Sequence, residues 1–318
     1  MQQPYSSIPH SNSSATSKRS ANHWWMLAGI SIIFLTASCK QNPETITNQQ
    51  QETAPELIYS NSFDSADDLK DWKMEGPGIA EIQDGKLLIH SKWMNALTDL
   101  QKEIPINLNI PGGQSYYQYL EKWVTEKEPQ NLAKYKFKRT DQPTAKFVGG
   151  HIQYWNTRVH PENFKITIQF QALNPYPLHM VSFCGNGTNG EDLFSPKLKS
   201  RYGLASQYMR GDISNYRISY WSGTRKTCNS RKAPGRILLA DDTNELPESA
   251  LNKPVLLEII RWKGRVQFKC DNAILTDWTD TENPLKSGYF SLRLMATASG
   301  LYDDFNIYKL TENPFTKI

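Results

Sequence analysis

The sequence predicts an all-β sandwich with a partly helical insertion, and three observations support this fold class. Short segments of alternating apolar and polar residues recur along the chain, as in the run from Phe164 to Phe170. Turn-forming pairs such as Asp84-Gly85 and Asp271-Asn272 separate these segments. Only one patch, residues 116–126, has the composition and spacing of a helix. Many short strands with turn signals are typical of two packed antiparallel sheets.

Length and charge limit the classes of partner. The chain has 318 residues and a formal net charge of +4, which allows one large domain or two small ones. The near balance of charge and the lack of a long basic run argue against nucleic acid as a partner. The sequence contains no Walker motif and no Gly-x-Ser-x-Gly nucleophile elbow.

The amino terminus predicts export from the cytoplasm. Lys18 and Arg19 precede an apolar run over residues 24–35, about half of the roughly 20 residues that a spanning helix needs. Small residues then lead to Cys39, an order that resembles a bacterial lipobox and implies cleavage and lipidation at this cysteine. Lys40 at the next position would leave the lipoprotein free to reach an outer membrane. The alternative is an uncleaved amino-terminal anchor.

The domain organisation follows from composition. Residues 1–38 are the predicted lipoprotein signal peptide, and residues 39–56 are polar and proline-bearing, which predicts a flexible tether. The sandwich domain is predicted over 57–310, with the insertion at about 91–147 and a tail at 311–318. Beyond Cys39, the three remaining cysteines permit at most one internal disulfide, and they show no zinc-binding spacing.

The stretch from Gly211 to Gly235 is the strongest candidate for a binding site. A strand is predicted in which Tyr216, Ile218 and Tyr220 alternate with Arg217, Ser219 and Trp221. A loop follows with four basic residues, Arg225, Lys226, Arg231 and Lys232. We interpret the polar aromatic face as a floor, and the basic loop as a wall, for an anionic sugar. A plain sheet face with a solvated basic loop is the alternative.

Several short motifs occur along the chain in this order: Phe63-Asp64, Asp71-Trp72, Glu75–Gly78, Tyr154–Asn156, Gly190–Phe194, Gly211–Ile213, Tyr216–Tyr220, Asn229–Lys232, Asp277–Asp280 and Tyr302–Phe305. Together they resemble the YesU-like family of uncharacterised bacterial proteins over about 57–90 and 148–310. The insertion departs from the compact pattern of the family. The resemblance implies a concanavalin A-like, galectin-like jelly roll and a setting of polysaccharide degradation, without an established reaction.

Polysaccharide binding requires aromatic faces for the sugar ring, and amides and cations for its hydroxyls and carboxylates. The candidate ligand-binding residues are Trp155, Asn156, Gln207, Arg225, Asn229, Arg231 and Lys232. For each of them, a structural hydrogen bond or a surface charge is the alternative.

Two kinds of catalysis would act on an acidic polysaccharide. Glycoside hydrolysis needs a carboxylate pair, but Glu191 and Asp192 are adjacent and point apart on an extended backbone. Elimination from a uronate needs a base at the α-carbon and a cation at the carboxylate. His151, Tyr216 and Tyr220 are the candidate bases, and Arg225 or Arg231 the candidate neutraliser; a structural role for His151 is the alternative.

The sequence therefore predicts a lipid-anchored, extracytoplasmic protein that binds or acts on an acidic polysaccharide or oligosaccharide. A polysaccharide lyase or an unusual glycosidase is the alternative, and a structural envelope protein without a ligand is a weaker one. No organic cofactor is expected. A structural calcium ion at Asp192 or Asp212 is left open, because these carboxylates could equally fix the loop.

Overall fold

The computed structural model describes residues 54–91, 94, 151–174, 178–220, 228–242, 244, 246–251, 253–295 and 298–316. The predicted signal peptide, Cys39, most of the tether, nearly all of the insertion and Arg225 lie outside the described residues. In the part of the chain that is described, no helix is long and apolar enough to cross a membrane.

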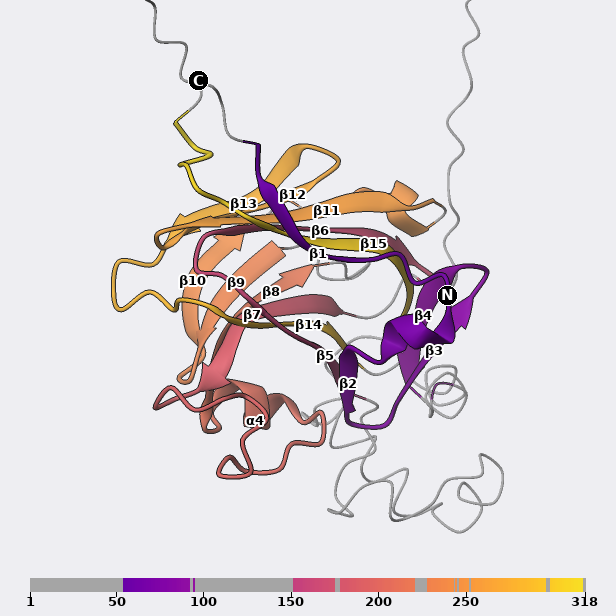
Figure 1. Cartoon of the computed structure of the whole chain (residues 1–318), viewed down its shortest axis with the longest axis horizontal. Coiled ribbons are helices and arrows are strands. Elements are labelled where there is room, and N and C mark those ends of the chain that lie inside the picture. Colours follow the sequence, from indigo (N-terminus) through magenta and orange to yellow (C-terminus); the bar gives the residue numbers. More distant parts are fainter. Residues whose placement is uncertain are drawn as a thin grey trace, which may run out of the picture. The chain divides into compact units, whose positions relative to one another are not determined.

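The described chain forms two antiparallel sheets that lie face to face (Figure 1). One sheet has the order β13-β12-β11-β6-β15-β4-β3, with β1 also paired to β15. Its strands are β1 (Glu56–Asn61), β3 (Gly78–Gln83), β4 (Lys86–Ser91), β6 (Phe164–Ala172), β11 (Val255–Trp262), β12 (Arg265–Cys270), β13 (Ala273–Thr279) and β15 (Ser299–Lys309).

The second sheet has the order β10-β9-β8-β7-β14-β5-β2. Its strands are β2 (Trp72–Glu75), β5 (Ile152–His160), β7 (His179–Gly187), β8 (Ile213–Tyr220), β9 (Cys228–Ala233), β10 (Ile237–Asp242) and β14 (Gly288–Leu294). The described helices are short, namely the 3-10 helices η1 (Ala66–Leu69) and η3 (Glu248–Leu251) and the α-helix α4 (Ala205–Met209). The predicted all-β sandwich is confirmed.

Local chemistry explains the hairpins. Asp84 and Gly85 join β3 to β4, and both have a positive φ, at 51° and 67°. Asp271 and Asn272 join β12 to β13 with φ values of 46° and 71°. Tight turns of this kind twist in the same sense as the strands that they connect, and Asp, Asn and Gly tolerate the left-handed region. Both turns were predicted at these residues.

Alternation along the strands builds the core between the sheets. On β8, Tyr216, Ile218 and Tyr220 point into the core, where they pack with residues from the opposite sheet such as Phe268 and Trp278. Because successive strand residues face opposite sides, Arg217 lies on the outer face of the seven-stranded sheet. The expectation that the tyrosine face would form a sugar-binding floor is therefore wrong.

The predicted basic loop also requires a correction. Residues 228–233 are a strand, β9, which pairs antiparallel with β8 and places Arg231 directly opposite Arg217 and Lys232 directly opposite Tyr216. A row of lysine and arginine next to small polar residues has little strand propensity by itself. Pairing with two neighbours, β8 and β10, determines the conformation of this segment.

Candidate functional site

Residues 188–212, here called the strap, connect β7 to β8 and lie against the outer face of the seven-stranded sheet (Figure 1). Leu193 and Tyr208 of the strap form a small apolar cluster with Trp155, Ile213 and Tyr289 of the sheet. Burial of these side chains gives the strap its own core, separate from the main one. The strap therefore holds a fixed position over β5 and β14.

A buried carboxylate anchors the strap to the sheet. Glu75 on β2 accepts hydrogen bonds from Trp155 Nε1 at 3.0 Å and Tyr208 Oη at 2.8 Å. Arg201 of the strap donates to the same carboxylate from Nε at 3.1 Å and from Nη2 at 2.8 Å. The ion pair is almost fully shielded from solvent. Trp155, expected to stack on a sugar, is thus a packing residue with its indole N–H satisfied.

A second buried cation, Arg293 on β14, supports the middle of the strap. Its Nη1 donates to Gln153 Oε1 and its Nη2 to the carbonyl of Gly203, both at 3.0 Å. The guanidinium also lies over the ring of Tyr208, 4.8 Å from the centroid. Gly203 has a φ of +87°, and a Cβ there would lie 2.0 Å from the carbonyl oxygen of His151. The strap and β5 therefore approach backbone to backbone at this glycine.

His151 is buried beside this contact. Burial lowers the pKa of its imidazole to about 3, and the charge of Arg293 acts in the same direction. The side chain is therefore neutral at neutral pH and a very weak proton acceptor. This placement does not support the expected role of His151 as a base in elimination.

A shallow pocket of about 150 Å³ lies on the outer face of the seven-stranded sheet, where α4 meets β8, β9 and the turn before β10. We call it the arginine pocket, and its lining residues are Met209, Asn215, Arg217, Arg231, Lys232, Ala233 and Arg236.

Two hydrogen bonds hold the walls of the arginine pocket together. Asn215 Nδ2 donates to the carbonyl of Tyr208 at 3.1 Å, and the Gly235 amide donates to the carbonyl of Met209 at 2.9 Å. They tie α4 to β8 and to the β9–β10 turn. The position of the strap therefore determines the shape of the pocket.

Arg217 lies at the centre of the pocket and is only 8 % exposed. Its Nη2 donates to the sulfur of Met209 at 2.8 Å, and its Nε has no hydrogen-bond partner in the structure. Thioether sulfur is a weak acceptor for a cation. Burial lowers the pKa of the guanidinium to about 9, and the charges of Arg293, Arg231 and Arg236 act in the same direction. Arg217 is thus a buried cation surrounded by other cations.

The other two arginines of the pocket also have no carboxylate partner among the residues that the structure describes. Arg231 is half-buried, and its Nη1 donates to the carbonyl of Arg236 at 3.4 Å. Among the described residues, no aspartate or glutamate forms an ion pair with Arg217, Arg231 or Arg236. The pocket therefore carries uncompensated positive charge and can accept an anion.

Lys232, the next residue on β9, behaves differently. Its ammonium group donates to Asp280 Oδ2 at 2.7 Å and to the carbonyls of Glu282 and Asn283. Burial by itself would raise the pKa of Asp280, but hydrogen bonds from Lys232 and Tyr216 bring it below its ordinary value. The charge of Lys232 is thus committed to a structural ion pair, and the expected ligand-binding role is not supported for it.

The two tyrosines of β8 lie out of reach of a polysaccharide. Tyr216 and Tyr220 are fully buried between the sheets. Tyr216 donates to Asp280 and accepts from the Leu285 amide, and burial raises the pKa of both phenols well above the ordinary value. Neither side chain is placed to take a proton from a sugar, because both face the core.

The remaining candidates have mixed placements. Asn156 is buried and bonds to the carbonyl of Asp71 and the amide of Arg158. The side chain of Gln207 accepts from Tyr202 and Leu204 and donates to Ser200, which closes the start of α4. Asn229 lies on β9 opposite Ser219, on the same face as Arg217 and Arg231. Of the expected ligand-binding residues, Arg231 and Asn229 therefore share a face with the pocket.

Asp192 and Asp212, two acidic residues of the strap, hold the strap together and tie it to β14. Asp192 accepts hydrogen bonds from the Phe194 amide and the Tyr289 hydroxyl, and Asp212 accepts from the Lys199 amide. Within the described ranges, no group of three or more His, Cys, Asp or Glu side chains converges as metal ligands. Residues 185–190 have Gly-x-Gly-x-x-Gly spacing, but they end β7 and enter a turn rather than a helix, which does not fit a dinucleotide site.

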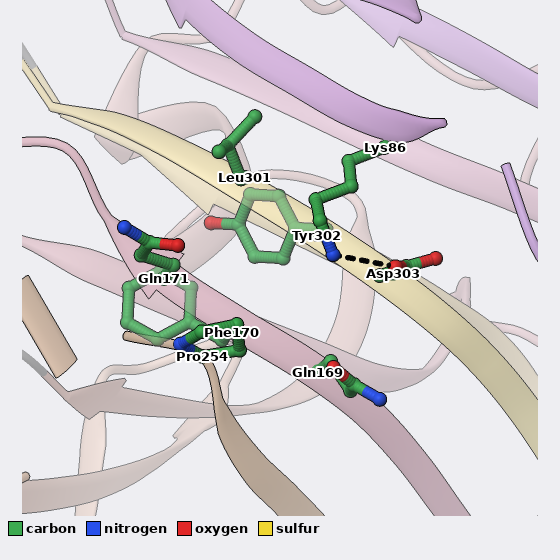
Figure 2. A pocket seen from close by; sticks show the side chains of 8 residues that line it. All are labelled: Lys86, Gln169, Phe170, Gln171, Pro254, Leu301, Tyr302 and Asp303. Carbon is green, nitrogen blue, oxygen red and sulfur yellow. Dashed lines mark hydrogen bonds and ion pairs between the residues drawn. The ribbon is translucent and has the colours of Figure 1, made fainter. Parts of the chain in front are cut away.

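A second pocket lies on the outer face of the eight-stranded sheet (Figure 2). Its empty volume is about 160 Å³, and Lys86 and Asp303 form an ion pair across it at 2.8 Å. Gln169 Nε2 donates a hydrogen bond to the carboxylate of Asp304 at 2.7 Å. The aromatic residues beneath it, such as Tyr302, are fully buried. This pocket carries no uncompensated charge and offers no exposed ring, so it fits a ligand less well than the arginine pocket does.

Five of the seven lining residues of the arginine pocket were not predicted as site residues, namely Met209, Asn215, Arg217, Ala233 and Arg236. The alternation on β8 does place Arg217 opposite to the buried tyrosines, so the sequence contained a signal for it. No local pattern indicates that Met209 or Arg236 would meet it, because β-pairing and the strap bring them together.

Comparisons with known proteins identify the family. The model of the family described as "Domain of unknown function (DUF1961)" matches residues 115–307. The uncharacterized protein YesU of Bacillus subtilis (strain 168) is 26% identical over 263 residues, which cover 79% of this chain and 95% of YesU.

One solved structure shows the same fold. A protein of unknown function with a galectin-like fold from Bacillus subtilis matches with a TM-score of 0.60 and 24% identity, over 80% of this chain and 96% of the other. A more distant match is a β-1,3-1,4-glucanase derived from a mouse hindgut metagenome, with a TM-score of 0.43 and 10% identity over 79% and 98% of the two chains. The sandwich is therefore galectin-like. Because the family model matches more than half of this chain, the chain belongs to the DUF1961 family.

Proposed function

We propose that this protein is a carbohydrate-binding protein that holds an acidic glycan at the arginine pocket. One observation carries the proposal: Arg217 is buried with an unpaired Nε, beside two further arginines, and no described carboxylate neutralises them. Buried charges are normally paired, because an unpaired one loses its hydration without compensation. An anionic ligand supplies the missing partner, and guanidinium groups suit carboxylates and sulfates in particular.

The size and surroundings of the pocket favour a group carried on a larger molecule. The pocket is shallow, and its empty volume of about 150 Å³ includes space that is open to solvent, so it does not enclose a whole small ligand. An anionic substituent would lie against the arginines at its mouth, while the rest of the ligand lies along the outer face. Asn229, which is half-buried on β9, continues that face, and its amide is suited to sugar hydroxyls.

Affinity electrophoresis tests the proposal directly. Protein from residue 40 onward is run through gels that contain acidic or neutral polysaccharides. We expect retardation by acidic polysaccharides only, and loss of that retardation in Arg231→Gln. Lys253→Gln, an exposed cation away from the pocket, removes the same charge and is the matched control. Binding at the arginine pocket would be contradicted if neutral and acidic polysaccharides retarded the protein equally. It would also be contradicted if acidic polysaccharides retarded the two variants equally.

The same incubations distinguish binding from elimination. Ultraviolet absorbance reports the carbon–carbon double bond that a polysaccharide lyase leaves on a uronate. The buried positions of His151, Tyr216 and Tyr220 favour binding without cleavage, so no new absorbance is expected. Absorbance that grows with time and disappears in Arg217→Gln would instead identify a lyase.

We also propose that the protein is exported and anchored by a lipid on Cys39, outside the cytoplasm. The support is the order of positive residues, short apolar run, small residues and cysteine at the amino terminus. Expression of the full chain with Cys39→Ser tests it. The wild type should partition into detergent with the membrane fraction, whereas the variant should lose the lipid. If the wild type and Cys39→Ser partition identically and both keep the signal segment, the result would favour an uncleaved anchor.

A further inference from the structure

The charges of the arginine pocket exceed what one carboxylate can neutralise. Arg217, Arg231 and Arg236 contribute three positive charges to one small pocket, without an ion-pair partner among the described residues. A single uronate would bring one negative charge. Arg217 is buried, Arg231 is half-buried and Arg236 is exposed, so the repulsion between the guanidinium groups is strongest at Arg217. The pocket therefore favours a ligand with more than one negative charge.

The arginines are also held in place. Arg217 and Arg231 are directly opposite each other on neighbouring strands, where like charges are destabilising. Arg217 is retained by the sulfur of Met209, and Arg231 by the carbonyl of Arg236. These contacts involve neutral acceptors, so they position the cations without neutralising them.

Lys232 shows how the same strand treats a cation with a structural role. Lys232 follows Arg231 directly, and its ammonium group donates hydrogen bonds to one carboxylate and two carbonyls at 2.6 to 2.8 Å. On the inner side of β9 the fold thus supplies a counter-charge, and on the outer side it does not. The absence of a described carboxylate around the arginines is therefore specific to the pocket face.

We propose that the natural ligand carries two anionic groups close together, as on a sulfated uronan, with both groups bound in the arginine pocket. This inference rests on the proposed function and specifies its ligand. One group faces Arg217 and Arg231 on the sheet, and the second faces Arg231 and Arg236 at the turn. A plain polyuronate, with one carboxylate on each sugar, satisfies only part of the site.

Heparin and its desulfated, re-N-acetylated form test the inference with one backbone. The desulfated form keeps one carboxylate on each uronate and lacks the sulfates beside it. Titration calorimetry at fixed salt should show that heparin binds at least about tenfold more tightly than the desulfated form. The slope of log Kd against log salt should fall by about one in Arg231→Gln, because one ionic contact is lost. Lys253→Gln should leave the slope unchanged.

The outcomes separate the inference from the proposed function. If desulfated heparin or polygalacturonate binds as tightly as heparin, one carboxylate is enough and the inference falls while acidic-glycan binding stands. If no acidic polysaccharide binds, both fall. If Lys253→Gln lowers the affinity as much as Arg231→Gln does, the binding is a general charge effect and the inference also falls. Arg231 is half-buried, so its variant tests the site even where Arg217→Gln fails to fold.

Discussion

Replacement of Arg217 by methionine should make the ligand-free protein more stable. Arg217→Met removes a buried, uncompensated cation and substitutes an unbranched apolar side chain of similar length. The new side chain would lie against Met209 and the walls of the arginine pocket, from which the charge has gone. Replacement of buried charged groups by apolar ones of similar volume is often neutral or stabilising, by about 1–4 kcal/mol.

The pKa of Arg217 sets an upper limit for the gain. This pKa falls from its ordinary value to about 9 in the folded protein, and one pKa unit corresponds to about 1.4 kcal/mol. The charged form therefore costs the folded state up to about 5 kcal/mol at neutral pH. Loss of the bond to Met209 and imperfect packing of the new side chain reduce the gain, so we expect about 1–3 kcal/mol. For a domain of this size, about 1 kcal/mol shifts Tm by roughly 2–4 °C.

The pH dependence of this gain has a definite sign. The unfolded chain holds the proton of Arg217 more tightly than the folded chain does, so wild-type stability recovers as pH rises above about 9. Below about pH 8 both states are protonated and the full cost is present. Urea unfolding of the two proteins in parallel should thus show a constant gap below pH 8 that narrows above pH 9.

A single result would refute this reasoning. Suppose that Arg217→Met is less stable than wild type by about 1 kcal/mol or more at pH 7. The charge of the guanidinium is then neutralised within the folded protein, and the pocket does not need an anionic ligand. The change in Tm on addition of an acidic polysaccharide is a second test. The polysaccharide should raise the Tm of the wild type, because the ligand binds only the folded state, and leave the Tm of the variant unchanged.

Two further predictions concern the scaffold. Lys232→Met should destabilise the protein by about 3 kcal/mol, because it leaves Asp280 buried without its cation. Since the pKa of Asp280 is lowered in the folded state, this gap in urea stability should close as pH falls through that lowered value; a gap that persists in acid would point to lost packing instead. Gly203→Ala should cost at least about 2 kcal/mol more than Gly190→Ala. Both glycines have a φ near +87°, but only at Gly203 would the new Cβ collide with the carbonyl of His151, so equal melting temperatures would contradict the close approach.

Local sequence predicted the strands and turns because those signals are short in range. Alternation of apolar and polar residues located β6, β8 and the strands of the β11–β13 meander, and Asp84-Gly85 located the β3–β4 turn. Period-two alternation reports that a strand has two unlike faces. The alternation along β8 did not indicate which face is buried, because tyrosine hydroxyls and arginine guanidiniums both suit a half-polar surface. The two sheets decided this by burying the larger apolar area of Tyr216 and Tyr220.

The conformation of β9 and the strap lay beyond local prediction for the same reason. A basic segment has no strong preference for a strand, and it becomes one because β8 and β10 offer hydrogen bonds on both sides. The buried anchor of the strap depends on Glu75, which is distant in sequence from its partners Arg201 and Tyr208.

By itself, then, the sequence determined an all-β chain, its family resemblance, and a basic segment around residue 231 as the place to look for a ligand. Only the tertiary structure decided that Arg231 shares a pocket with Arg217 and Arg236 while Lys232 is neutralised by Asp280. The physical reason is that strand residues one apart face opposite sides of the sheet. Two neighbouring cations on β9 therefore enter different environments, one lined with a carboxylate and carbonyls and the other lined with arginines.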